Sequence, residues 1–88
     1  MNDRHDDIFE RVATVVRSTF RLSATAPILP TTSSVDIDGW DSLSHSILII
    51  GIEDEFALEL PFERVFALND LAELATLIRE TQIERSTK

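Results

Sequence analysis

Residues 41–56 read DSLSHSILIIGIEDEF, a stretch that decides the fold. Asp41 and Ser42 are both residue types that cap helix N-termini, and the apolar run that follows predicts a helix from one of them to about Phe56. At about 100° per residue, this helix is apolar on two sides. One side holds His45, Leu48, Ile49, Ile52 and Phe56, and the other holds Leu43, Ile47, Ile50 and Asp54. We expect the first side to face the core.

The segment before this helix divides into another predicted helix and a long connection. Apolar residues at steps of three and four predict an amphipathic helix from about Arg4 to Leu22. They are Ile8, Val12, Val15, Val16 and Phe20. From Ser23 to Trp40 the periodicity is lost while proline, serine, threonine and glycine accumulate, which predicts a long loop. Isolated apolar residues should pin this loop to the core, and they are Ile28, Leu29, Val35 and Ile37.

Two further helical segments are predicted after the central helix. A turn at Pro61 precedes one helical turn that ends at about Phe66. A last helix is capped by Asn69 or Asp70, and Glu73 stands three residues after Asp70, as in a capping box. The inward stripe of that helix consists of Leu71, Leu74, Ala75 and Ile78.

The chain is therefore expected to be all-α. We predict a small helical bundle of three longer helices and one short helix, with a long loop between the first two. Residues 1–88 suffice for a single domain, with an ordered core at about residues 4–83 and flexible termini. Residues 83–88 read as a fraying tail. The core should join Leu48, Ile52 and Phe56 to Val12, Val16, Phe20, Leu74 and Ile78.

Composition narrows the range of functions. Sixteen acidic and eight basic residues give a net charge of −8, which disfavours binding to nucleic acid. The chain contains no cysteine, so disulfides, thiolate metal sites and a cysteine nucleophile are excluded. The longest apolar run, Ile47–Ile50, is far shorter than the ~20 residues of a membrane span. We expect a cytoplasmic monomer that binds neither nucleic acid nor membranes and is too small to hold a deep catalytic pocket.

A metal site is not expected. Asp36, Asp38 and Asp41 have part of the spacing of an EF-hand calcium loop. Ile47, however, stands where that loop needs a bidentate glutamate. The two histidines, without any cysteine, do not make a transition-metal site.

Ser42 is the sharpest candidate for chemistry, because it starts a helix after a long loop and lies near backbone N–H groups that favour a phosphate. From residue types alone, a simpler interpretation is that Ser42 or Asp41 only caps the helix. A pairing of Ser42 with His45 as nucleophile and base lacks the glycine elbow and oxyanion hole of a hydrolase. We interpret His45 as a partly buried, hydrogen-bonded histidine that touches the loop.

The order of these parts resembles the acyl carrier protein family over roughly residues 8–83. The matching motifs are Asp41-Ser42-Leu43, the apolar run Ile47–Ile52, Glu53-Asp54-Glu55-Phe56 and Leu60-Pro61. The resemblance implies that Ser42, flanked by Asp41 and Leu43, carries a 4′-phosphopantetheine group, which a phosphopantetheinyl transferase takes from coenzyme A. The thiol of this arm would hold an acyl or aminoacyl group as a thioester, and the chain itself would not be an enzyme.

The same resemblance implies further partners, namely an acyl- or aminoacyl-loading ligase and a downstream transferase or synthase. Trp40 before Asp41 is similar to stand-alone carriers of dedicated biosynthetic pathways. Fatty acyl, polyketide and aminoacyl cargo all stay open.

The outer side of the central helix is a candidate surface for partners. Leu43, Ile47 and Ile50 form an apolar strip there, with Glu53 and Asp54 at its far end. The alternative is that this strip packs beneath the long loop. A rival interpretation of the whole chain is an acidic helical adaptor that binds a protein through the strip and is never modified.

Overall fold

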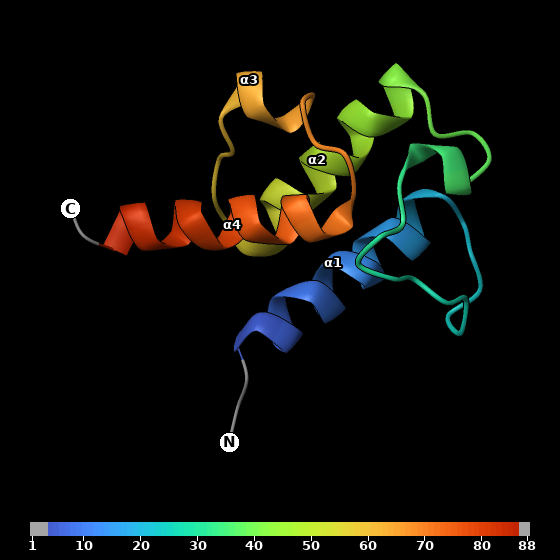
Figure 1. The fold of residues 1–88 in the computed structure, drawn as a ribbon, viewed down its shortest axis with the longest axis horizontal. Coiled ribbons are helices and arrows are strands. Elements are labelled where there is room, and N and C mark those ends of the chain that lie inside the picture. The colour runs from blue at the N-terminus through green and yellow to red at the C-terminus, as the bar shows by residue number, and fades with distance from the viewer. Residues whose placement is uncertain (1–3, 87–88) are drawn as a thin grey trace.

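Four α-helices make up the fold, and no strand occurs among residues 4–86, which the computed structural model describes (Figure 1). The helices are α1 (Arg4–Thr19), α2 (Ser42–Phe56), α3 (Phe62–Val65) and α4 (Leu71–Ser86), and a 3₁₀ helix, Ser34–Asp36, interrupts the loop between α1 and α2. The predicted all-α bundle of three longer helices and one short helix is confirmed. The expectation of flexible termini concerns in part residues 1–3 and 87–88, which lie outside the described residues.

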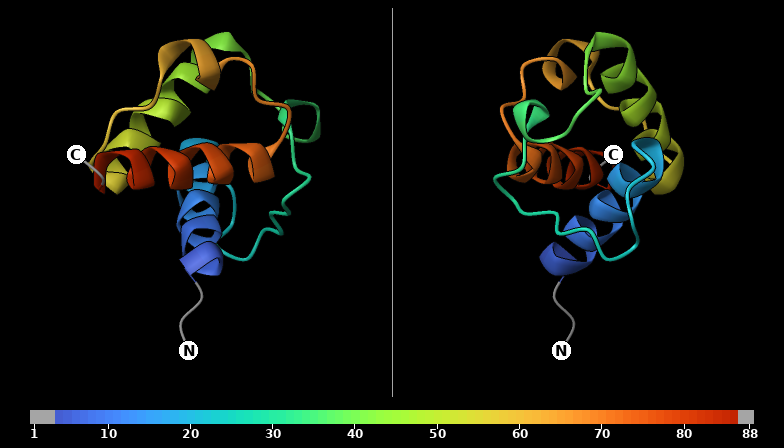
Figure 2. Two further views of the ribbon diagram at one scale, coloured as in Figure 1. Left: turned by 60° about the vertical axis from the view of Figure 1, so that its left-hand side comes forward. Right: turned by 90° about the vertical axis from the view of Figure 1, so that its right-hand side faces the viewer.

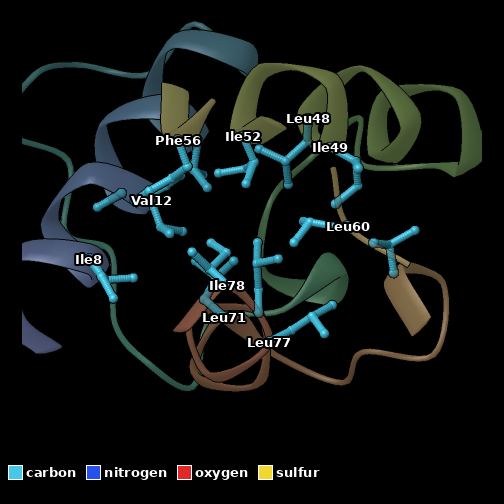
Figure 3. Close-up of a cluster of buried hydrophobic side chains, with 14 of the residues drawn as sticks. Ile8, Val12, Leu48, Ile49, Ile52, Phe56, Leu60, Leu71, Leu77 and Ile78 are labelled. Atoms are coloured by element: carbon cyan, nitrogen blue, oxygen red, sulfur yellow. The ribbon is translucent and has the colours of Figure 1, made fainter. Parts of the chain in front are cut away.

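The core lies where α1, α2 and α4 meet. Figure 3 shows side chains of α2 pointing toward those of α1 and α4. Leu48 and Ile52 of α2 are fully buried there, together with Val12 of α1 and Ile78 of α4. The side of α2 that was expected to face the core therefore does so.

α1 ends at Thr19, three residues before the predicted end at Leu22. Arg21 adopts a left-handed φ of 57°, and the N–H of Leu22 donates back into the last helical turn over 2.8 Å. No glycine marks this stop, so the sequence pattern gave no signal for it. Phe20, which was predicted to be in the core, lies in the turn and is only partly buried. Its ring contacts Trp40, with the ring centroids 5.1 Å apart.

The long connection is tied by its backbone to the start of α4. The N–H groups of Leu71 and Ala72 donate to the carbonyl oxygens of Thr32 and Pro30 over 3.0 and 2.8 Å. Asp70, one of the two predicted caps, accepts a hydrogen bond from the N–H three residues further on. The loop thus satisfies helix N–H groups that would otherwise lack partners. Figure 2 shows the connection running beside α1 and past the start of α4.

Two of the four apolar residues that were expected to pin this loop do so. Ile28 is buried and Ile37 is partly buried against the core. Leu29 and Val35 are 57% and 90% exposed, so the expectation is wrong for them. Because backbone hydrogen bonds to α4 hold the loop, these two side chains can remain in water.

α4 continues to Ser86, so the prediction of a fraying tail is wrong for residues 83–86. Thr81 is buried, and its hydroxyl donates to the carbonyl oxygen of Leu77 over 2.8 Å. One turn further on, Arg85 Nη1 donates to the carbonyl oxygen of Ala57 over 2.7 Å. The Thr81 bond lies within α4, whereas the Arg85 bond holds the last turn of α4 against the end of α2.

α1 and α2 approach each other closely along Gly51 and Glu55. A Cβ atom at Gly51 would lie 3.1 Å from Val15 Cγ1, so α1 leaves little room for a side chain there. Arg11 of α1 binds Glu55 of α2 twice, with Nε 2.8 Å from Oε2 and Nη2 2.8 Å from the carbonyl oxygen. The same guanidinium lies 4.3 Å from the centroid of the Phe56 ring.

We predict that Phe56→Ala lowers the free energy of unfolding by about 3–5 kcal/mol, because Phe56 is only 8% exposed and its loss leaves a cavity. Urea denaturation followed by circular dichroism measures the change. Phe62→Ala is the matched control: the Phe62 side chain is 75% exposed, so this variant should lie within about 0.5 kcal/mol of the wild type. An unchanged unfolding midpoint for Phe56→Ala would contradict the packing described above.

Candidate functional site at the start of α2

Ser42 is the first residue of α2 and follows the long connection directly. Its side chain is exposed, and its hydroxyl makes no hydrogen bond to any residue that the structure describes. The helix N-terminus beside it carries the partial positive charge of the helix dipole and N–H groups that point out of the helix. A phosphate attached to this hydroxyl would therefore meet favourable electrostatics.

Asp41, not Ser42, caps α2. Its backbone is extended, with φ −120° and ψ −168°, and its carboxylate accepts a hydrogen bond from the Ser44 N–H over 2.9 Å. This bond is the main cause that lowers the pKa of the Asp41 carboxyl below its ordinary value of 3.8. The Ser44 hydroxyl donates to the carbonyl oxygen of Gly39 over 2.7 Å, which closes the turn before the helix. Capping thus leaves the Ser42 hydroxyl free.

His45 joins three parts of the chain beside this turn. Trp40 Nε1–H donates to His45 Nδ1 over 3.1 Å, and His45 Nε2 lies 2.7 Å from the carbonyl oxygen of Val65 at the end of α3. The prediction of a partly buried, hydrogen-bonded histidine that touches the loop is confirmed. The turn before Ser42 is consequently tied to both α2 and α3.

A cleft of about 280 Å³ opens beside Ser42. It lies between the start of α2, the 3₁₀ helix and the segment that leads from α3 into α4. Its lining includes Ser34, Trp40, Asp41, Ser42, His45, Phe66, Leu68, Asn69, Leu71 and Leu74. The floor is apolar, because it is formed by leucines of α4, while the rim carries hydroxyl, amide and carboxylate groups. A group attached to Ser42 can therefore fold back toward an apolar floor.

The outer side of α2 is in water. Leu43, Ile47 and Ile50 are 71%, 52% and 64% exposed, so the long loop does not cover this strip. Asp54 is exposed at the far end. Glu53 is only partly exposed, and its Oε2 accepts a hydrogen bond from the Leu60 N–H over 2.9 Å. Glu53 therefore holds the connection between α2 and α3 besides contributing charge to this face.

Two exposed aromatic residues that the sequence pattern did not mark lie at α3, Phe62 at its start and Phe66 directly after its end. Phe62 and Phe66 are 75% and 49% exposed, and their rings meet edge to face with centroids 5.3 Å apart. Phe66 also contacts His45, with ring centroids 5.1 Å apart. A four-residue helix offers too few positions for a periodicity argument, so only the aromatic residue type could have drawn attention to this pair.

Neither a metal site nor a membrane span is found among the described residues. No group of three or more histidine, aspartate or glutamate side chains in residues 4–86 could hold an ion. Asp36 Oδ2 instead accepts a hydrogen bond from the Ser33 N–H over 2.9 Å within the loop. No helix in this part of the chain is long and apolar enough to cross a membrane.

Comparisons with known proteins point to one family, although no protein-family model matches the chain. The mitochondrial acyl carrier protein of Dictyostelium discoideum is 31% identical over 75 residues, which are 85% of this chain. The matched region spans 61% of that relative's length. The solution structure of holo acyl carrier protein from Geobacter metallireducens has a similar fold, with a TM-score of 0.77, 25% identity and 90% of each chain covered.

We predict that Asp41→Ala lowers the melting temperature at pH 7, whereas Ser42→Ala leaves it close to that of the wild type. The lowered pKa means that folding favours the charged carboxyl. Its contribution is complete above the unfolded value of 3.8 and is lost as the pH falls through the lower folded value. Melting curves from pH 7 into acid should therefore show the difference between Asp41→Ala and wild type shrinking once the pH falls below 3.8. Equal losses for the two variants at pH 7 would mean that Ser42 shares the cap.

Proposed function

We propose that this chain, which is similar to acyl carrier proteins over most of its length, carries an acyl or aminoacyl group on a 4′-phosphopantetheine arm attached to Ser42. The observation that carries this proposal is the exposed Ser42 hydroxyl, which capping by Asp41 leaves without a hydrogen bond. When bound, the arm supplies a thiol that holds the cargo as a thioester. Partner enzymes perform the reactions, and the chain holds and presents the group.

The residues around Ser42 fit this group. The first turn of α2 places backbone N–H groups and the positive end of the helix dipole next to the hydroxyl, which favours the negative charge of a phosphodiester. Asp41 and Leu43 flank the attachment point, and Leu43 is 71% exposed. A transferase can therefore approach Ser42 from the open side of α2, while Trp40 and His45 hold the turn behind it in place.

The outer side of α2 is the proposed surface for partner enzymes, which are the phosphopantetheinyl transferase, a loading ligase and a downstream transferase or synthase. Leu43, Ile47 and Ile50 supply apolar contact area. The carboxylates of Glu53 and Asp54 add negative charge at the end of the strip, and such charge steers a basic partner surface during approach. An unmodified adaptor would use the same strip, and only the fate of Ser42 separates the two functions.

We predict that one phosphopantetheine is added to the protein, and that Ser42→Ala accepts none while it stays folded. The measurement is intact mass after incubation with coenzyme A and a promiscuous phosphopantetheinyl transferase. Ser44→Ala and Ser46→Ala are matched controls. Ser44 lies in the same helical turn as Ser42 and Ser46 lies in the next, and both variants should be modified. An unmodified wild type beside a modified control carrier would reject the proposal in favour of the adaptor.

We predict that Ile47→Glu weakens binding to a cognate loading ligase by about tenfold, with little change in melting temperature, because a charge would enter the centre of the apolar strip. Surface plasmon resonance and thermal melting measure the two effects. Ile83→Glu is the matched control, since Ile83 of α4 is 54% exposed against 52% for Ile47. Equal binding losses for the two variants would show that charge alone, and not the strip, governs recognition.

A further inference from the structure

We propose that His45 keeps a long alkyl chain of the cargo in the open cleft beside Ser42, because it closes the way from this cleft into the core. This inference rests on the function proposed above and concerns the cargo of the same site. It is carried by three observations, which are a row of aromatic rings, the hydrogen bonds at both nitrogens of His45, and the filled core behind them.

Three rings form one wall of the cleft. The Trp40 and His45 rings are stacked with centroids 6.1 Å apart, and the His45 and Phe66 rings follow with centroids 5.1 Å apart. All three residues line the cleft. Phe20 extends the row to the end of α1, where its ring centroid lies 5.1 Å from that of Trp40. The row of rings therefore reaches from the end of α1 past the start of α2 to the end of α3, and its part from Trp40 to Phe66 lines the cleft.

Both ring nitrogens of His45 are engaged, which fixes the ring. The indole N–H of Trp40 can only donate, so His45 Nδ1 must accept and the ring proton lies on Nε2. That N–H then donates to the carbonyl oxygen of Val65, which belongs to a residue only 2% exposed. Turning the ring aside would break both bonds and leave a buried carbonyl without its donor. The His45 ring is therefore held in a fixed position between α2 and α3.

The core behind the His45 ring is already filled with side chains. Leu48 and Ile52 follow His45 on the same side of α2 and are fully buried. Leu74, which forms part of the cleft floor, is 1% exposed. A close-packed core of this kind admits no further methylene groups unless its side chains move. An alkyl chain can thus use the cleft of about 280 Å³, but it reaches the core only by displacing His45.

Chain length is the variable that tests the inference. A chain that enters an apolar interior gains stabilisation with every methylene removed from water, and it stabilises the folded protein to which it is attached. A chain that remains in solvent gains nothing of this kind. In the wild type a chain reaches only the open cleft, so we expect the melting temperature to change much less from an acetyl to a dodecanoyl arm than in a variant that opens the core.

The experiment loads Ser42 with these three arms from the corresponding acyl-coenzyme A and a promiscuous transferase, and intact mass verifies each product. Melting temperature is the first readout, and the emission of Trp40, the single tryptophan of the chain, is the second. In His45→Ala the melting temperature should rise by about 4 °C or more from acetyl to dodecanoyl, and the emission should shift with chain length. Ser46→Ala, a serine outside the cleft lining, should behave like the wild type.

A second variant covers the case that His45→Ala does not fold. Trp40→Phe keeps a ring in the wall but removes the donor to His45 Nδ1. Its melting temperature should therefore rise with chain length, but less than that of His45→Ala. A rise in the wild type as large as that in His45→Ala, or no larger rise in any folded variant, would overturn the inference. Failure of the wild type to accept any arm would instead reject the proposed function.

Discussion

The hydrogen bond between the Ser44 N–H and the Asp41 carboxylate fixes where α2 begins, and the geometry of the site depends on it. A helix that began one residue later would make Ser42 the cap and would engage its hydroxyl with the helix backbone. With Asp41 in that role, the hydroxyl stays free. The same start places His45 in the first turn, where its ring reaches both Trp40 and Val65.

α2 is apolar on two sides, but α1 and α4 cover only one of them. A domain of 88 residues has too few helices to bury both sides. Leu43, Ile47 and Ile50 consequently stay in water near Ser42, and Phe62 adds further exposed apolar surface on α3. Contiguous exposed apolar surface of this kind usually marks an interaction site. The limited size of the fold therefore leaves the side of α2 beside Ser42 available to partners.

Local signals in the sequence predicted α2, its core-facing side and the number of helices, because caps and periodicity act within a few residues. They failed where a helix end carries no recognisable residue type, or where contacts between separate parts of the chain decide. The end of α1 lacks a glycine signal, and the last turns of α4 are held by Arg85, which reaches Ala57 across the fold. The bond from His45 to Val65 spans twenty residues, and the one from Leu60 to Glu53 spans seven. Neither pairing has a sequence pattern that periodicity could detect.

The distribution of charge supports the proposed attachment point at the start of α2. Among the described residues, two ion pairs occur, Arg11 with Glu55 and Arg64 with Glu80. Arg17 and Arg85 instead donate to backbone carbonyl oxygens and hold a loop and a helix end. Two of these four arginines thus pair with no carboxylate in this part of the chain, and the chain carries a net charge of −8 because its acids outnumber its bases. A phosphodiester adds to this excess, so it is best tolerated at a helix N-terminus, where the dipole offsets part of its charge. At the other end of α2, the dipole and the acidic residues 53–55 would both oppose it.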